Sequence, residues 1–451
     1  MDTIEKGRSI TDDAFQGQKN LIDLPDEDLV EIFKRLDTTT AARVMKSNKK
    51  LRRIVKDKKV TNEICKDMVY SPRIEVFCNY QPFIDETKGP GFWCSKHSDM
   101  CEKVIFKSDQ LIDQGDGAYR IRDGVKVIHE EAFRNNQEIK KITIPNSVTK
   151  IGPRAFSNCK NLLRVTIPNS ITVISAEMFT GCERLTTVNI PHSVTYIGSA
   201  AFENCEGLQT IIIPDSVTKL GDNIVFSGCT SLVSIELSKS LKEIPRYCFQ
   251  NCKSLKSITI PDSVTEIEEN AFRQCTSLET IDFSNSLKII GYTAFINCTH
   301  LTTLILPNTV EYIGNASFKD CAMLTAVTLP EAITTITPLT FSGCTSLIAI
   351  TIPNSVKGIS DGAFKNCTSL ISITIPFSVD YVGQNAFTEC TSLTSVTILN
   401  PDVQISWYAF SDCPGLTKEN VTLPHRFNWG IPNNKTFFDR ELQDELKALY
   451  G

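Results

Sequence analysis

A phenylalanine recurs at a fixed step through the middle and C-terminal parts of this 451-residue chain. Eleven of the twelve intervals are 23 residues long and one is 24. A period in this range is typical of stacked repeats, in which each unit buries its apolar side chains against its neighbours. The column consists of Phe133, Phe156, Phe179, Phe202, Phe226, Phe249, Phe272, Phe295, Phe318, Phe341, Phe364, Phe387 and Phe410.

Each repeat carries the pattern of one short strand. The segment Leu255–Pro261 reads Leu-x-x-Ile-x-Ile-Pro, and its alternation predicts a strand that ends at a residue without an N–H donor. Val148–Phe156 returns the chain, and its polar and glycine residues favour turns with a short helical turn. We therefore expect an α+β repeat protein, a leucine-rich-repeat solenoid with a parallel β ladder, over residues 117–424 in about 13 repeats.

Cysteine follows the phenylalanine by three residues in twelve repeats. Parallel side chains one strand apart place their Cβ atoms too far apart for a disulfide, and each repeat supplies one ligand only. Cysteine also packs well as a small apolar side chain. We favour buried free thiols over disulfides, and disulfides over a ladder of metal ions.

The repeat sequence resembles a known family. Residues 144–162 read Ile-Pro-Asn-Ser-Val-Thr-Lys-Ile-Gly-Pro-Arg-Ala-Phe-Ser-Asn-Cys-Lys-Asn-Leu, which is similar to BspA-like leucine-rich repeats. The resemblance covers about two thirds of the chain. Members of that family are surface antigens and adhesion proteins in some organisms and intracellular proteins in others, so the resemblance implies protein binding without fixing a compartment.

Residues 21–66 differ from the repeats, and a polar tail, residues 1–20, precedes them. Leu-Pro at 24–25 opens an apolar helical pattern that ends in Leu-Asp at 36–37. This segment resembles an F-box, although Leu51 stands where that family often has tryptophan. The resemblance implies docking to the adaptor of a cullin-type ubiquitin ligase through Leu24, Pro25, Leu29, Ile32 and Phe33. The alternative is a helical cap on the solenoid.

A basic run follows within this helical module. Residues 43–59 contain nine lysines and arginines and one acid, Asp57. Such a run can contact phosphates, but it has no interleaved aromatic residues. We therefore favour the solvated face of a helix over nucleic-acid binding.

The segments that flank the repeats are less regular. In the connector, residues 67–116, Cys78, Cys94, His97 and Cys101 could complete a tetrahedral zinc site. We favour an irregular connector with unrelated thiols, because the spacing matches no strong template. Residues 425–451 predict a helical cap, with Phe437, Phe438, Leu442, Leu446 and Leu449 on one apolar face.

Signs of catalysis and of membrane targeting are absent from the sequence. It contains no phosphate-binding loop, no dinucleotide fingerprint and no metalloprotease or nucleophile-elbow motif. It shows no signal peptide and no apolar stretch long enough to cross a membrane. We expect a cytoplasmic or nuclear binding protein that is not an enzyme and has no cofactor.

The outward positions of the expected ladder provide a candidate ligand patch. Ten residues after each phenylalanine the column is mostly threonine, which favours strands. Ile212, Glu236, Asp282 and Ile305 break this pattern near the middle of the ladder. The preferred hypothesis is a substrate receptor that links a target protein on the ladder to a ubiquitin ligase. The alternative is a surface or secreted adhesion protein or antigen.

Overall fold

The computed structural model describes residues 104–105, 111–425, 427 and 438–450. The chain divides into two compact units, Met1–Lys103 and Val104–Gly451, and the second is the unit described below. The F-box-like segment, the basic run and the possible zinc ligands Cys78, Cys94, His97 and Cys101 lie outside the described residues.

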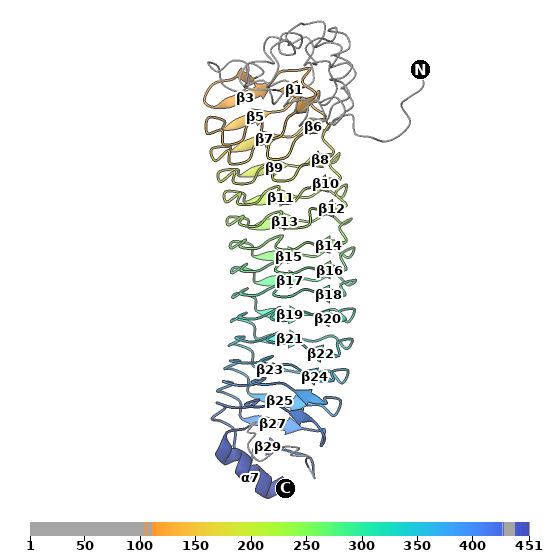
Figure 1. Ribbon diagram of the computed structural model, residues 1–451, viewed down its shortest axis with the longest axis vertical. Helices are drawn as coiled ribbons and strands as arrows, with labels where there is room; N and C mark the ends of the chain where they lie inside the picture. The colour runs from red at the N-terminus through yellow and green to blue at the C-terminus, as the bar shows by residue number, and fades with distance from the viewer. Residues whose placement is uncertain (1–103, 106–110, 426, 428–437, 451) are drawn as a thin grey trace, which may run out of the picture. The chain divides into compact units, whose positions relative to one another are not determined.

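The second unit is a parallel β-solenoid of about 13 turns, as the repeat predicts (Figure 1). Each coil contributes one strand to a first ladder, whose paired strands are parallel and in register, as in Lys141 with Arg164. The strand pairing is interrupted at three places along this ladder. The unit begins at Val104. The first ladder consists of β3 (Ala118–Ile121), β5 (Lys141–Thr143), β7 (Arg164–Thr166), β9 (Thr187–Asn189), β11 (Thr210–Ile212), β13 (Ser234–Glu236), β15 (Ser257–Thr259), β17 (Thr280–Asp282), β19 (Thr303–Ile305), β21 (Ala326–Thr328), β23 (Ala349–Ile350), β25 (Ser372–Ile375), β27 (Ser395–Ile398) and β29 (Val421–Thr422).

A second parallel ladder occupies the returning segment, where we expected a short helical turn. Its strands have two residues each, and turns lead from each of them to the next phenylalanine. They are β1 (Val104–Ile105), β4 (Val127–Ile128), β6 (Lys150–Ile151), β8 (Val173–Ile174), β10 (Tyr196–Ile197), β12 (Lys219–Leu220), β14 (Glu243–Ile244), β16 (Glu266–Ile267), β18 (Ile289–Ile290), β20 (Tyr312–Ile313), β22 (Thr335–Ile336), β24 (Gly358–Ile359), β26 (Tyr381–Val382) and β28 (Gln404–Ile405).

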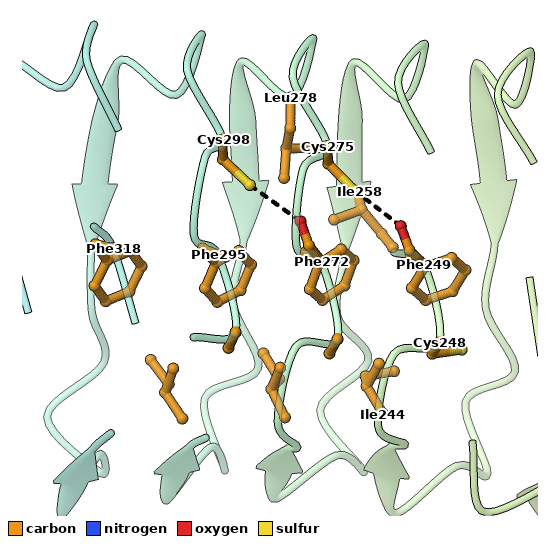
Figure 2. Packing of buried hydrophobic residues seen from close by; sticks show 14 of the residues in the cluster. Ile244, Cys248, Phe249, Ile258, Phe272, Cys275, Leu278, Phe295, Cys298 and Phe318 are labelled. Carbon is orange, nitrogen blue, oxygen red and sulfur yellow. Dashed lines mark hydrogen bonds between the residues drawn. The ribbon is translucent and has the colours of Figure 1, made fainter. Parts of the chain in front are cut away.

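The core lies between the two ladders and is built from columns of identical side chains. The rings of successive phenylalanines stack with centroids 5.0–5.7 Å apart and planes 1–19° from parallel. Figure 2 shows four of these rings, Phe249, Phe272, Phe295 and Phe318, in one row. The strand spacing of about 4.8 Å brings equivalent rings into contact. The repeat period therefore fixes the packing of the core.

Two residues of nearly every coil adopt the left-handed backbone conformation. One is the second residue before the phenylalanine, and the other is the second residue after it. Around Phe156 these are Arg154, with φ 54°, and Asn158, with φ 56°. The second position is mostly asparagine, aspartate or glycine, the residues that tolerate this conformation best. The two bends turn the chain around the phenylalanine and back toward the first ladder.

The C-terminal end of the solenoid is covered by a helix. Phe438 stacks on Phe410 with ring centroids 5.1 Å apart, and so extends the phenylalanine column by one ring. The helix that follows, α7 (Arg440–Tyr450), buries Leu446 and also Gln443. Leu449, which we expected on the apolar face, is 59% exposed. It lies in the last turn of the helix.

Candidate protein-binding surface

The first ladder has one face toward the core and one toward solvent, here called the ladder face. In most of its three-residue strands the middle side chain is buried and the outer two are exposed, as in β11, where Ile211 is buried. The exposed positions lie eight and ten residues after each phenylalanine. The alternation of the sequence therefore decides which columns a partner can contact.

The residues predicted as a ligand patch lie on this face, along one line. Ile212 pairs with Glu236 on the adjacent strand, and Thr259 pairs with Asp282. With Ile305 they form a row on the strands of five successive coils, β11, β13, β15, β17 and β19, although no strand pairing joins β13 to β15 or β17 to β19. Its ends are apolar and open to solvent, since Ile212 is 62% and Ile305 is 73% exposed. The row Ile212, Glu236, Thr259, Asp282 and Ile305 is called the mixed row below.

The two coils that carry the acids share a second departure from the repeat. Ser238 and Ser284 stand where most coils have proline. Their hydroxyls donate to the carbonyls of Val217, at 2.6 Å, and Val264, at 2.7 Å. In an ordinary coil, Ser216 makes the same bond to Val194 from two residues further along the turn. The serines therefore have a structural explanation within the turn.

The acids have no such explanation. Among the described residues, no ion pair or hydrogen bond involves the carboxylate of Glu236 or Asp282. The nearby outer column, seven residues after the phenylalanine, adds Lys256 and Glu279, whose charges offset each other. The middle of the ladder face therefore carries two unpaired negative charges between two exposed isoleucines.

An aromatic pair beside the second ladder, with Tyr312 in β20 and Tyr292 in the turn after β18, was not predicted from the sequence. The rings of Tyr292 and Tyr312 meet edge to face, with centroids 6.3 Å apart, and both are exposed by more than a third. Partial burial and the hydroxyl of Tyr292 raise the pKa of Tyr312 to about 12. Strands of two residues give no alternation, so no sequence signal marks this position as outward-facing.

The cysteine column has the chemistry of a core and not of a reactive site. All thirteen described cysteines are buried and free. Burial raises the pKa of the Cys159 and Cys229 thiols to about 12, which keeps them protonated and unreactive at neutral pH. Within the described ranges, no group of three or more histidine, cysteine and carboxylate side chains could hold a metal ion.

The repeats and the N-terminal segment each match a known protein family. The BspA type leucine-rich repeat region matches in six copies, over residues 118–225, 223–325 and 311–428. The chain therefore belongs to the BspA-type leucine-rich repeat family. The F-box domain matches residues 21–63, which include the docking residues inferred from the sequence. No curated protein matches the chain.

Several solved leucine-rich repeat proteins are similar to this chain. A leucine-rich repeat protein from Bacteroides ovatus is 30% identical, covers 75% of this chain and 91% of its own, and superimposes with a TM-score of 0.59. A leucine-rich cell surface protein from Faecalibacterium prausnitzii is 29% identical, covers 65% of this chain and 94% of its own, and has a TM-score of 0.43. A leucine-rich repeat protein from Eubacterium ventriosum is 21% identical, covers 71% of this chain and 85% of its own, and has a TM-score of 0.44.

These findings define a leucine-rich repeat protein with an F-box domain, an organisation typical of non-enzymatic proteins that bind other proteins. Among the described residues, no helix is long and apolar enough to span a membrane.

Proposed function

We propose that this chain is a substrate receptor that links a target protein to a cullin-type ubiquitin ligase, in the cytoplasm or nucleus. The F-box segment docks to the ligase adaptor, and the ladder face holds the target. The observation that carries the proposal is the F-box match at residues 21–63 ahead of a BspA-type solenoid.

The docking residues follow from the motif. Leu24, Pro25, Leu29, Ile32 and Phe33 occupy its opening and its first apolar helical pattern. An apolar helix face inserted into a partner's groove is a common mode of recognition. An aspartate placed in such a groove is desolvated without a partner, so it opposes binding strongly.

The solenoid suits the second half of the proposal. Its coils contact mainly their neighbours, so the ladder face keeps its geometry when the N-terminal segment is altered. The exposed isoleucines of the mixed row are the apolar anchors for a target, and its two acids select the charge of that target.

The experiment is co-purification of the full chain with the ligase adaptor from cells. The double variant Leu29→Asp/Ile32→Asp is expected to lose the adaptor and to keep the β-type circular dichroism of the solenoid. The matched control Ile212→Asp/Ile305→Asp makes the same chemical change on the ladder face and is expected to keep the adaptor. A wild-type chain that binds no adaptor would overturn the proposal, as would equal adaptor binding by both variants.

The alternative function, a surface or secreted adhesion protein, is compatible with the BspA-type repeats but leaves the F-box match without a role. It requires passage through a secretory route. Asn315 begins an Asn-Ala-Ser sequon and is exposed, so a secreted eukaryotic chain would acquire a glycan there. A chain that carries such a glycan in its native cell would favour the alternative.

A further inference from the structure

We propose that the mixed row recognises an α-helix that lies along the solenoid axis. This helix presents two basic side chains seven residues apart and one apolar side chain three residues outside each of them. The proposal rests on the proposed function, because it names the kind of target segment that the receptor holds.

The charge of the partner follows from the unpaired acids. Glu236 and Asp282 are exposed and, in the described part of the chain, have no cationic partner. Thr259 lies between them, so that the two carboxylates are separated by two coils. A partner with two cations at that separation neutralises both of them.

The apolar ends set the partner's flanking residues. Ile212 neighbours Glu236 on one side, and Ile305 lies one coil beyond Asp282 on the other. Both isoleucines have more than half of their surface open to water. Along the mixed row the side chains are therefore apolar, acidic, neutral, acidic and apolar, in an order that is symmetric about Thr259. A complementary partner presents apolar, basic, basic and apolar side chains in that order.

The spacing selects a helix over an extended segment. At about 4.8 Å per coil, the acids are about 9.6 Å apart and the isoleucines about 19 Å apart. In an α-helix of 1.5 Å rise, residues seven apart are separated by about 10.5 Å and residues thirteen apart by about 19.5 Å. With 3.6 residues per turn, positions i−3, i, i+7 and i+10 also lie on one side of the helix, within an arc of about 140°. In an extended strand, a step of about 9.6 Å is about three residues, which puts the two cations on opposite faces.

The test is selection from a display library in which a stable helix is randomised at these four positions of one face. The full-length wild-type chain is expected to enrich lysine or arginine at i and i+7, and apolar residues at i−3 and i+10. The variant Glu236→Gln/Asp282→Gln keeps side-chain shape but removes both charges, and a selected helix is expected to bind it about tenfold more weakly or worse. The control Glu243→Gln/Glu266→Gln removes two charges from the second ladder and is expected to bind normally.

Three outcomes of the selection would overturn the inference. They are no enriched sequence, enrichment without the two cations, and equal binding to the wild type and to Glu236→Gln/Asp282→Gln. Self-association of the chain that this double variant abolishes would also overturn it, because the row would then serve a second copy. Adaptor binding is measured on the same preparations. An adaptor-bound chain without helix selection refutes this inference alone, whereas loss of adaptor binding refutes the proposed function.

Discussion

The thiol of Cys298 donates a hydrogen bond to the carbonyl oxygen of Phe272, with sulfur and oxygen 3.2 Å apart (Figure 2). The same carbonyl accepts the N–H of Cys275 from its own coil. The bond recurs in twelve coils at 3.0–3.3 Å, so each cysteine ties its coil to the preceding one. This relationship gives the cysteine column a role beyond its small volume.

The first prediction separates this role from simple packing. Replacing Cys298 with alanine removes both the donor and a buried sulfur, and should lower the free energy of unfolding by about 1–2 kcal/mol. Replacing it with serine keeps a donor, so Cys298→Ser should be at least as stable as Cys298→Ala in urea unfolding. If the serine variant is the less stable one, the site requires only an apolar side chain.

The second prediction concerns the phenylalanine column. Phe272 is fully buried and stacks on Phe249 and Phe295, with centroids 5.2 and 5.0 Å away. Phe272→Ala should therefore cost about 3–5 kcal/mol, because it leaves a large cavity between two coils. Urea unfolding followed by circular dichroism measures the loss. A cost below about 1 kcal/mol would contradict a core role for the column.

The third prediction is a loss of stability in alkali. The pKa of Cys159, Cys229, Cys367 and Cys413 rises from 9.0 to about 12 on burial. Above pH 9 the unfolded chain ionises these thiols while the folded chain keeps them protonated. The free energy of unfolding should therefore fall as pH rises from 9 toward 12.

Lysines also titrate in this range, so a matched variant is needed. The double variant Cys159→Ala/Cys413→Ala should show a shallower decline in urea midpoint between about pH 8 and pH 10 than the wild type. Identical declines in the two proteins would contradict the assignment to buried thiols.

The fourth prediction follows from the single 24-residue repeat. Its extra residue lies between Gly221 and Phe226, and there Ile224 adopts φ 46°, a strained conformation for a β-branched residue. Ile224→Asn should raise the free energy of unfolding by about 1 kcal/mol. At the equivalent position two residues before Phe387, Asn385 has φ 55°. The reverse change, Asn385→Ile, should lower the free energy of unfolding. Loss of stability in Ile224→Asn would mean that the isoleucine's packing outweighs the strain.

Much of the fold was predictable because the apolar columns repeat. The alternation around Ile258 predicted the first ladder, and the period placed the phenylalanine column in the core, where all thirteen of its members, Phe133 to Phe410, are buried. The second ladder was missed because a strand such as Lys150–Ile151 is too short to alternate. The bond from Cys298 to Phe272 was also missed, since it joins a side chain to a backbone atom that carries no sequence signal.

The candidate site divides in the same way. The sequence predicted that Ile212 and Ile305 face outward, because strand alternation fixes the face. The role of the two serines in the same coils as the acids was not predictable from the sequence. In the structure, the hydroxyls of Ser238 and Ser284 donate hydrogen bonds to backbone carbonyls of the preceding coils. The identity of a target does not follow from either level, because one surface specifies the chemistry of its partner and not the partner itself.

The central claim is that the chain joins a ligase to a target, and its most direct test is titration of purified adaptor into the full-length protein by calorimetry. The account predicts saturable binding of one adaptor per chain, with the negative heat-capacity change of apolar burial. It also predicts that Leu29→Asp/Ile32→Asp abolishes this binding, whereas Glu236→Gln/Asp282→Gln leaves it unchanged. Absence of binding by the wild type, or binding that survives Leu29→Asp/Ile32→Asp, would contradict the account.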